Sequence, residues 1–280
     1  MKHMTAINQS SIVIEPSRGF ISLKLKAIWD YRELLFFLAW RDLKARYAQT
    51  MVGLAWAVLQ PLLMMIVLTL VFSRLANIPS EGVPYPVFTY VALVAWTYFA
   101  KSLDRGGSSV VAETNLVTKV YFPRLIVPMS AVLGGLVDFG ISFVLLFVMM
   151  GWYGIVPGLQ VLLLPLLIGM SVMTALSISL WLAAFYVKYR DVGAVIPLLT
   201  QVWMFASPIV YPLSMVPKDW QWLYNINPMV GLIQSYRWVL LGTEPPDPLL
   251  AAQSGCLVIV LLIGGIAYFN KVERTFADVI

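Results

Sequence analysis

Long apolar runs dominate the pattern of hydrophobic and polar positions along this chain of 280 residues. A helix needs about 20 apolar residues to cross about 30 Å of hydrocarbon. Five runs without an internal Lys or Arg are long enough, and they cover residues 51–73, 127–150, 159–187, 192–211 and 249–269. A sixth run, 84–103, begins with two prolines and contains Lys101 near its end, but its centre is uncharged and aromatic. The pattern therefore predicts an all-α polytopic membrane protein with six transmembrane helices over residues 51–269.

The segment 29–47, which precedes the first run, has a different periodicity. At 100° per residue its aromatic and apolar positions form one narrow stripe beside its charged positions. This favours an amphipathic helix in the cytoplasmic membrane interface, with a soluble helix packed on a cytoplasmic partner as the alternative. Residues 1–28 lack the apolar core of a signal peptide and are expected to form a cytoplasmic tail, as are residues 270–280.

Two connections between the runs are long enough to have structure of their own. Residues 104–126 contain a Gly-Gly-Ser-Ser sequence and then a predicted short helix, 110–121, whose apolar side chains need a partner protein or lipid headgroups to cover them. Residues 213–248 are rich in Trp and Tyr, and prolines and glycines divide them into two short helical pieces. This segment either re-enters the membrane or lies on its surface as aromatic-anchored helices.

Composition removes several classes of function. Hydrophobic residues make up 60% of the chain and charged residues 12%, which is far from the composition of a soluble enzyme. With one cysteine, Cys256, and one histidine, His3, the chain has no intrachain disulfide, His-rich metal site or Ser-His-Asp triad. It also has no P-loop sequence, so it cannot bind ATP by a P-loop of its own. Its outer acidic residues lack the spacing of a metal site or of an acid–base pair, and we expect no catalytic residue, no metal and no cofactor bound by this chain.

The basic residues are distributed very unevenly about the predicted spans. Sixteen of the 19 Lys and Arg residues fall in the two tails, in the segment 29–47 and in or beside the connections on the same side. Because cytoplasmic loops carry an excess of Lys and Arg, both termini are predicted to be cytoplasmic. The net charge of +5 is thus a signal of topology, and no basic patch remains for nucleic acid.

Asp138 is an ionisable residue in the middle of a predicted span, where a carboxylate is costly. No Lys, Arg or His is expected at comparable depth, so Ser142, Thr174 and Gln201 are the candidate partners. Two interpretations remain open for Asp138, a hydrogen bond between helices and a place on a transport path.

Several short motifs occur in a specific order relative to the six runs. They are Trp40, Arg41, Asp42, Leu43, Lys44, Tyr47, Gly53, Trp56, Pro61 and Phe72, then Lys119, Phe122, Pro123 and Arg124, then Tyr189, Arg190 and Asp191, and finally Ser207, Pro208, Ile209, Tyr211, Pro212, Asn227, Pro228, Arg237 and Gly242. Over about residues 30–280 this set resembles the permeases of type 2 ABC exporters, which move bacterial surface polysaccharides such as O-antigen and teichoic acid. O-antigen, capsule and teichoic acid permeases share the pattern.

The resemblance implies a homodimer around a channel in the bacterial inner membrane, with a lipid-linked polysaccharide as substrate. It also implies two separate nucleotide-binding ATPase subunits, which bring ATP and Mg²⁺ and engage the helix between the second and third spans. The residues expected at that contact are Leu116, Val117, Lys119, Val120, Tyr121 and Arg124.

A polysaccharide path should present aromatic rings to the C–H faces of sugars, with amides and hydroxyls nearby. The first and fifth spans, both interrupted by proline, are expected to line it. The candidate path residues are Trp56, Gln60, Tyr90, Trp96, Tyr98, Asp138, Gln201 and Trp203. Packing within the protein or against lipid is the alternative for each aromatic residue.

Two other functions compete with polysaccharide export. One is an integral-membrane transferase acting on lipid-linked sugars, which would need outer carboxylates drawn from Glu81, Asp219, Glu244 and Asp247. The other is a type 2 ABC permease for drugs or lipids.

Overall fold

The computed structural model describes residues 25–48, 53–273 and 276. Most of the predicted tail 1–28 and part of the tail 270–280 lie outside these residues. The described chain is all-helical. Its elements are α1 (Leu25–Asp30), α2 (Arg32–Ala48), α3 (Gly53–Leu68), the π-helical η1 (Thr69–Leu75), α4 (Tyr85–Ala112), α5 (Thr114–Lys119), α6 (Ile126–Leu133), α7 (Leu136–Trp152), the 3₁₀ turn η2 (Leu159–Leu163), α8 (Leu164–Lys188), α9 (Val192–Phe205), the 3₁₀ turn η3 (Leu213–Met215), α10 (Lys218–Asn225), α11 (Pro228–Leu241) and α12 (Pro248–Val272).

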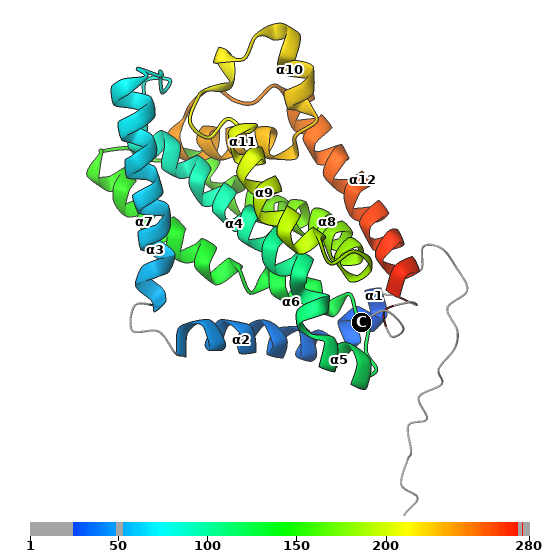
Figure 1. Ribbon diagram of the computed structural model, residues 1–280. Helices are drawn as coiled ribbons and strands as arrows, with labels where there is room; N and C mark the ends of the chain where they lie inside the picture. The colour runs from blue at the N-terminus through cyan, green and yellow to red at the C-terminus, as the bar shows by residue number, and fades with distance from the viewer. Residues whose placement is uncertain (1–24, 49–52, 274–275, 277–280) are drawn as a thin grey trace, which may run out of the picture.

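Helix α4 lies at the centre of the bundle, where it contacts α3, α6, α7, α8, α9 and α11 (Figure 1). Almost every side chain from Val87 to Phe99 is buried. A helix surrounded by protein does not have to match lipid on its outer surface, so α4 tolerates aromatic and hydroxyl side chains and Lys101. This explains why its sequence is the least apolar of the six predicted spans.

The predicted loop at residues 104–109 is wrong, because α4 continues as a helix to Ala112. The Gly-Gly-Ser-Ser sequence is a site of close helix packing. A Cβ on Gly106 would lie 2.7 Å from Ser179 Oγ of α8, and one on Gly107 would lie 2.9 Å from Ile196 Cδ1 of α9. The Ser179 hydroxyl donates across the contact to the Ser102 carbonyl at 3.0 Å. Small residues therefore bring the helices together here, as is common in membrane bundles.

The predicted short helix over 110–121 is confirmed in part: α5 forms a separate helix over Thr114–Lys119, whereas residues 110–112 belong to α4. The backbone leaves the helical region at Val120, which is extended.

The predicted span 127–150 consists of two helices, α6 and α7, interrupted at Gly134 and Gly135. A Cβ on Gly134 would lie 3.2 Å from Arg46 Nη2, and one on Gly135 would lie 3.3 Å from the Tyr98 ring. The two glycines thus let α2 and α4 approach the junction. Asp138 consequently lies in the first turn of α7, and not in the middle of one straight helix.

Helix α2 lies crosswise to α3 at one end of the bundle and packs on α6 (Figure 1). Leu38 is its buried contact, whereas Phe36, Phe37 and Trp40 are exposed. The prediction that this helix lies in a membrane interface stays a prediction.

The opposite end of the bundle is formed by α10 and α11 (Figure 1). Helix α11 is buried and begins at an Asn227 cap, whose amide also donates to Ser207 Oγ at 2.9 Å. The buried Arg237 guanidinium donates to the Ile209 carbonyl at 2.9 Å and lies 3.5 Å from the centre of the Phe88 ring. These contacts fix α11 to α4 and to the turn that follows α9.

Four stretches among the described residues are long and apolar enough to cross a membrane, namely Val58–Leu75, Ile126–Trp152, Leu159–Lys188 and Pro248–Val272. Helix α9 is apolar, but it ends at Phe205 after 14 residues, short of the predicted limit at 211. The chain is therefore a multi-pass membrane protein, and the count of six crossings stays a prediction.

Replacing Gly106 by Ala should destabilise the bundle, because the new methyl group would overlap the Ser179 side chain on α8. We expect a loss of about 1 to 3 kcal/mol, measured as a lower unfolding temperature of the purified protein in lipid nanodiscs. Gly140→Ala in α7 is the matched control, since its Cβ would meet nothing within 4 Å. Equal unfolding temperatures for the two variants would show that the α4–α8 contact is not tight.

Candidate functional site

The predicted path residues on α3 and α9 lie largely on the surface of the single chain. Trp56 is 57% exposed, and Gln60 and Gln201 are also exposed. Trp203 is half-buried, and its ring is nearly perpendicular to that of Phe99 of α4, with the ring centres 5.2 Å apart. Helices α3 and α9 both pack on α4. Each of these two helices thus carries a Gln that is exposed in the single chain, and α3 also carries an exposed Trp.

The three predicted path residues on α4 lie in the interior. Tyr90, Trp96 and Tyr98 are each at most 4% exposed. Tyr98 stacks on Phe139 with ring centres 4.5 Å apart and donates to the Val132 carbonyl at 3.3 Å. Within one chain these rings contact protein, and the structure does not bring them together with Trp56 or Gln201 on an open surface.

Asp138 has basic partners, contrary to the expectation from the sequence. Its carboxylate accepts from Arg46 of α2 at 2.9 Å and from Arg105 of α4 at 3.2 Å, and the Tyr47 hydroxyl donates to its other oxygen. The prediction failed because the break before α7 and the extension of α4 bring both arginines to the first turn of α7.

None of the three partners predicted for Asp138 binds its carboxylate. Ser142 donates to the backbone carbonyl of Asp138, and Thr174 donates to the Met170 carbonyl. Gln201 is exposed on α9.

Burial and the neighbouring charges shift the pKa values of Tyr47 and Arg46 in this cluster. Burial, followed by the hydrogen bond to Asp138, raises the pKa of Tyr47 to about 12. The phenol therefore stays protonated at physiological pH and remains a donor to the carboxylate. Burial, followed by repulsion from Arg105, lowers the pKa of Arg46, and the charge of Asp138 opposes that effect. The cluster joins α2, α4 and α7 through one carboxylate.

A second ion pair joins α2 to the end of α4. Arg41 donates to both carboxylate oxygens of Glu113, the residue between α4 and α5. Together with the Asp138 cluster, this pair attaches α2 to the bundle at two places.

The predicted ATPase contact divides into a buried and an exposed part. Val117 is buried and Leu116 is partly buried against the same core, so these two side chains hold α5 on its own chain. Arg124 is also engaged within the chain, since it donates to the Glu273 carbonyl and lies 5.8 Å from the centre of the Phe276 ring. Lys119, Val120 and Tyr121 face outward, with Val120 51% and Tyr121 72% exposed.

Sequence reasoning missed the roles of Arg46, Arg105 and Glu113. One feature of the sequence pointed to the two arginines: a carboxylate such as Asp138 is costly inside a membrane unless a cationic side chain pairs with it. Among the described residues, no group of three or more His, Cys, Asp or Glu side chains is arranged to hold a metal ion.

Comparisons with known proteins identify the family of this chain. The family model described as "ABC-2 type transporter" matches residues 33–241, which is most of the chain. The chain belongs to the ABC-2 type transporter family.

Similar proteins match this ABC-2 family member along nearly their whole length. The O-antigen export system permease protein RfbA of Myxococcus xanthus is 33% identical over 91% of this chain and 98% of its own. A protein of the same name from Klebsiella pneumoniae is 27% identical over 93% of this chain and 100% of its own. The polysialic acid transport protein KpsM of Escherichia coli is 22% identical over 84% of this chain and 91% of its own. Transport is thus favoured over the transferase alternative.

Replacing Asp138 by Asn should destabilise this ABC-2 family chain, because Arg46 and Arg105 would lose the carboxylate between them. We expect a loss of about 2 kcal/mol, the usual scale for hydrogen bonds to charged groups, read as a lower unfolding temperature in nanodiscs. Asp104→Asn removes an exposed carboxylate from α4 and serves as the control. If both variants unfold at the wild-type temperature, Asp138 is not a structural link between the helices.

Proposed function

We propose that this ABC-2 family chain is the membrane permease subunit of an ATP-driven exporter for a lipid-linked polysaccharide of the O-antigen type. The observation that carries the proposal is the match to O-antigen export permeases across almost the full length of both chains. A match of that extent includes α3, α9 and the residues 104–126, which we name the coupling segment.

In this proposal the chain crosses the inner membrane six times, by α3 with η1, α4, α6 with α7, α8, α9 with its following turn, and α12. The end with α2 and α5 faces the cytoplasm, and so do both termini. The excess of Lys and Arg at that end supports this orientation. Helix α2 then lies in the inner interface with its exposed aromatic side chains in the headgroup region. Helix α11, buried against α4, re-enters from the outer side.

Two copies of the chain would enclose the channel between their α3 and α9 surfaces. Trp56, Gln60 and Gln201 are exposed in the single chain and are free to face a glycan in such a dimer. Trp203, also on α9, is half-buried. The buried rings of α4 support this wall from behind. A ring stacks weakly on many kinds of sugar, so a polymer can bind and still slide.

A separate ATPase subunit would bind the exposed part of the coupling segment and bring ATP and Mg²⁺. Support comes from the exposed apolar surface of Val120 and Tyr121 next to Lys119, just after α5. The short helix is anchored on the core by Val117. Arg41 and Glu113 tie its start to α2. A force that the ATPase applies at Tyr121 would therefore be transmitted to the core through Val117 and to α2 through the Arg41–Glu113 pair.

Replacing Tyr121 by Asp should weaken recruitment of the ATPase, because a carboxylate would be buried in the apolar centre of the contact. We expect about a tenfold or greater drop in co-purified ATPase per permease. Asn115→Asp adds the same charge at an exposed position of α5 and should have a smaller effect. Unchanged co-purification with the Tyr121 variant would rule out this contact.

Replacing Trp56 by Ala should reduce surface polysaccharide, because the ring is proposed to face the channel. The measurement is surface polymer per cell at matched permease level, in a strain whose own copy of the gene is deleted. We expect a several-fold loss for Trp56→Ala, since one aromatic contact contributes about 1 kcal/mol. The control is Trp152→Ala, which removes an 87% exposed ring at the end of α7.

Equal export by the Trp56 and Trp152 variants would show that Trp56 does not face the channel and packs against protein or lipid. Full surface polymer in the deletion strain itself would contradict the proposed function as a whole.

A further inference from the structure

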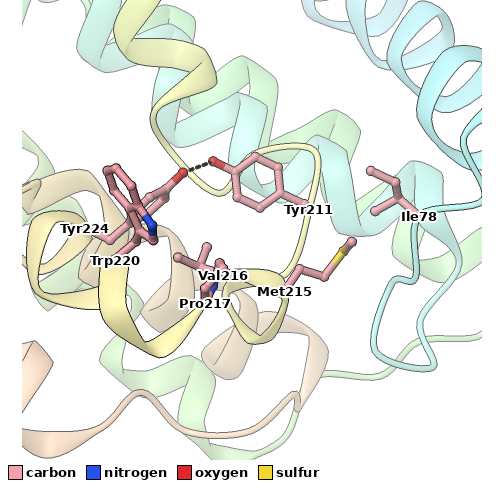
Figure 2. Close-up of a pocket in the computed structure, with 7 residues that line it drawn as sticks. All are labelled: Ile78, Tyr211, Met215, Val216, Pro217, Trp220 and Tyr224. Carbon is pink, nitrogen blue, oxygen red and sulfur yellow. Dashed lines mark hydrogen bonds between the residues drawn. The ribbon is translucent and has the colours of Figure 1, made fainter.

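A cavity of about 440 Å³ lies at the end of the bundle formed by α10 and α11. Its walls come from the segment after η1, through Ile78, and from the segment between α9 and α11, through Tyr211, Met215, Trp220 and Tyr224. Its volume is within the range of small-molecule sites. Figure 2 shows the Tyr211 and Tyr224 hydroxyls directed at each other, with Ile78 on the side of the cavity away from α10. None of the predicted path residues lines this cavity.

The hydroxyls of the cavity are arranged to accept hydrogen bonds. The Tyr211 hydroxyl donates to the Phe205 carbonyl at 3.0 Å, and this uses its single hydrogen. The 2.7 Å contact between Tyr211 and Tyr224 is then made by the Tyr224 hydrogen. The Tyr224 oxygen keeps its lone pairs but has no hydrogen left to offer. A ligand that forms a hydrogen bond with the Tyr224 oxygen must therefore supply the donor group.

The remaining walls are apolar or aromatic. Trp220 is 59% exposed and offers both a ring face and an indole N–H. In the part of the chain that the structure describes, no Lys, Arg, Asp or Glu lines the cavity, so no charged side chain there compensates the charge of a phosphate or a carboxylate. An acyl chain would fill the space but could not donate to the Tyr224 oxygen. A neutral sugar has both the C–H faces for the rings and the hydroxyl donors.

We propose that this cavity, which we name the outer aromatic site (Tyr211, Trp220 and Tyr224), binds a neutral sugar unit of the exported glycan on the outer face of the permease. The inference rests on the proposed function, because it takes the end with α10 as the exit side. The site adds a second point of contact for the polymer beyond the α3 and α9 surfaces.

The test measures binding of the cells' own surface polysaccharide to the full-length chain in lipid nanodiscs. The probe is that polysaccharide, freed of lipid by mild acid, labelled at its reducing end and followed by fluorescence anisotropy. Nanodiscs avoid sugar-headed detergents, which would compete. The variants are Trp220→Ala, Tyr224→Phe and, as control, Trp222→Ala, which removes a 64% exposed ring from the same helix outside the cavity.

We expect Kd to rise about tenfold in Trp220→Ala and about threefold in Tyr224→Phe, which keeps the ring and removes only the hydroxyl. Trp222→Ala should stay within about twofold of wild type. Any other pattern overturns the site, including no binding by the wild-type chain, or a Tyr224→Phe value equal to that of the control.

Failure of the site is distinguishable from failure of the proposed function. The amount of surface polymer on the strain that lacks this chain tests the proposed function separately. If that strain loses its surface polymer while the variants bind as the control does, only the outer aromatic site is wrong. If that strain keeps its surface polymer, the exporter proposal falls, and the site falls with it.

Discussion

The close contact between α4 and α8 at Gly106 and Ser179 determines most of the architecture. In a membrane there is no hydrophobic force that drives two helices together, so association depends on packing and on hydrogen bonds between helices. Glycine on α4 allows the approach, and the Ser179 hydroxyl adds a bond to the Ser102 carbonyl. Because α4 is held in this way, it can be almost fully buried from Val87 to Phe99 and continue to Ala112 without a break.

Two consequences of the uninterrupted α4 bear on function. It carries Arg105 to the start of α7, where this side chain and Arg46 share the carboxylate of Asp138. It also delivers Glu113 and α5 to the end of the bundle, where Glu113 pairs with Arg41. The segment proposed to meet the ATPase is therefore connected through ion pairs to α2, and α2 is connected to α7. Movement of α5 relative to the bundle would have to strain or break these links.

The sequence was sufficient for the elements that depend on composition alone. The runs that became α3, α8 and α12 are continuously apolar, and length and hydropathy identify them without knowledge of their neighbours. The glycines of α4 were misread because Gly-Gly-Ser-Ser favours a loop in water, whereas beside another membrane helix the same residues permit close packing. The partners of Asp138 were missed because they are 33 and 92 residues away, and a straight helix was assumed.

The candidate path could be predicted only by residue type. Trp56 and Tyr90 have similar chemistry, yet one is exposed on α3 and the other is buried in α4. Which side a ring faces depends on the neighbours of its helix, and no local pattern contains that information. The outer aromatic site escaped prediction for the same reason, since Ile78 and Tyr224 are brought together only by the fold.

The proposed function requires this chain to carry a finished, lipid-linked glycan from the inner to the outer side of the membrane. The most direct measurement is the location of that glycan after the chain is depleted from growing cells. An impermeant, labelled lectin is applied to intact cells and to the same cells after lysis. The account predicts that lipid-linked polymer accumulates and binds the lectin only after lysis. Lipid-linked polymer that is fully accessible on intact, depleted cells would contradict it.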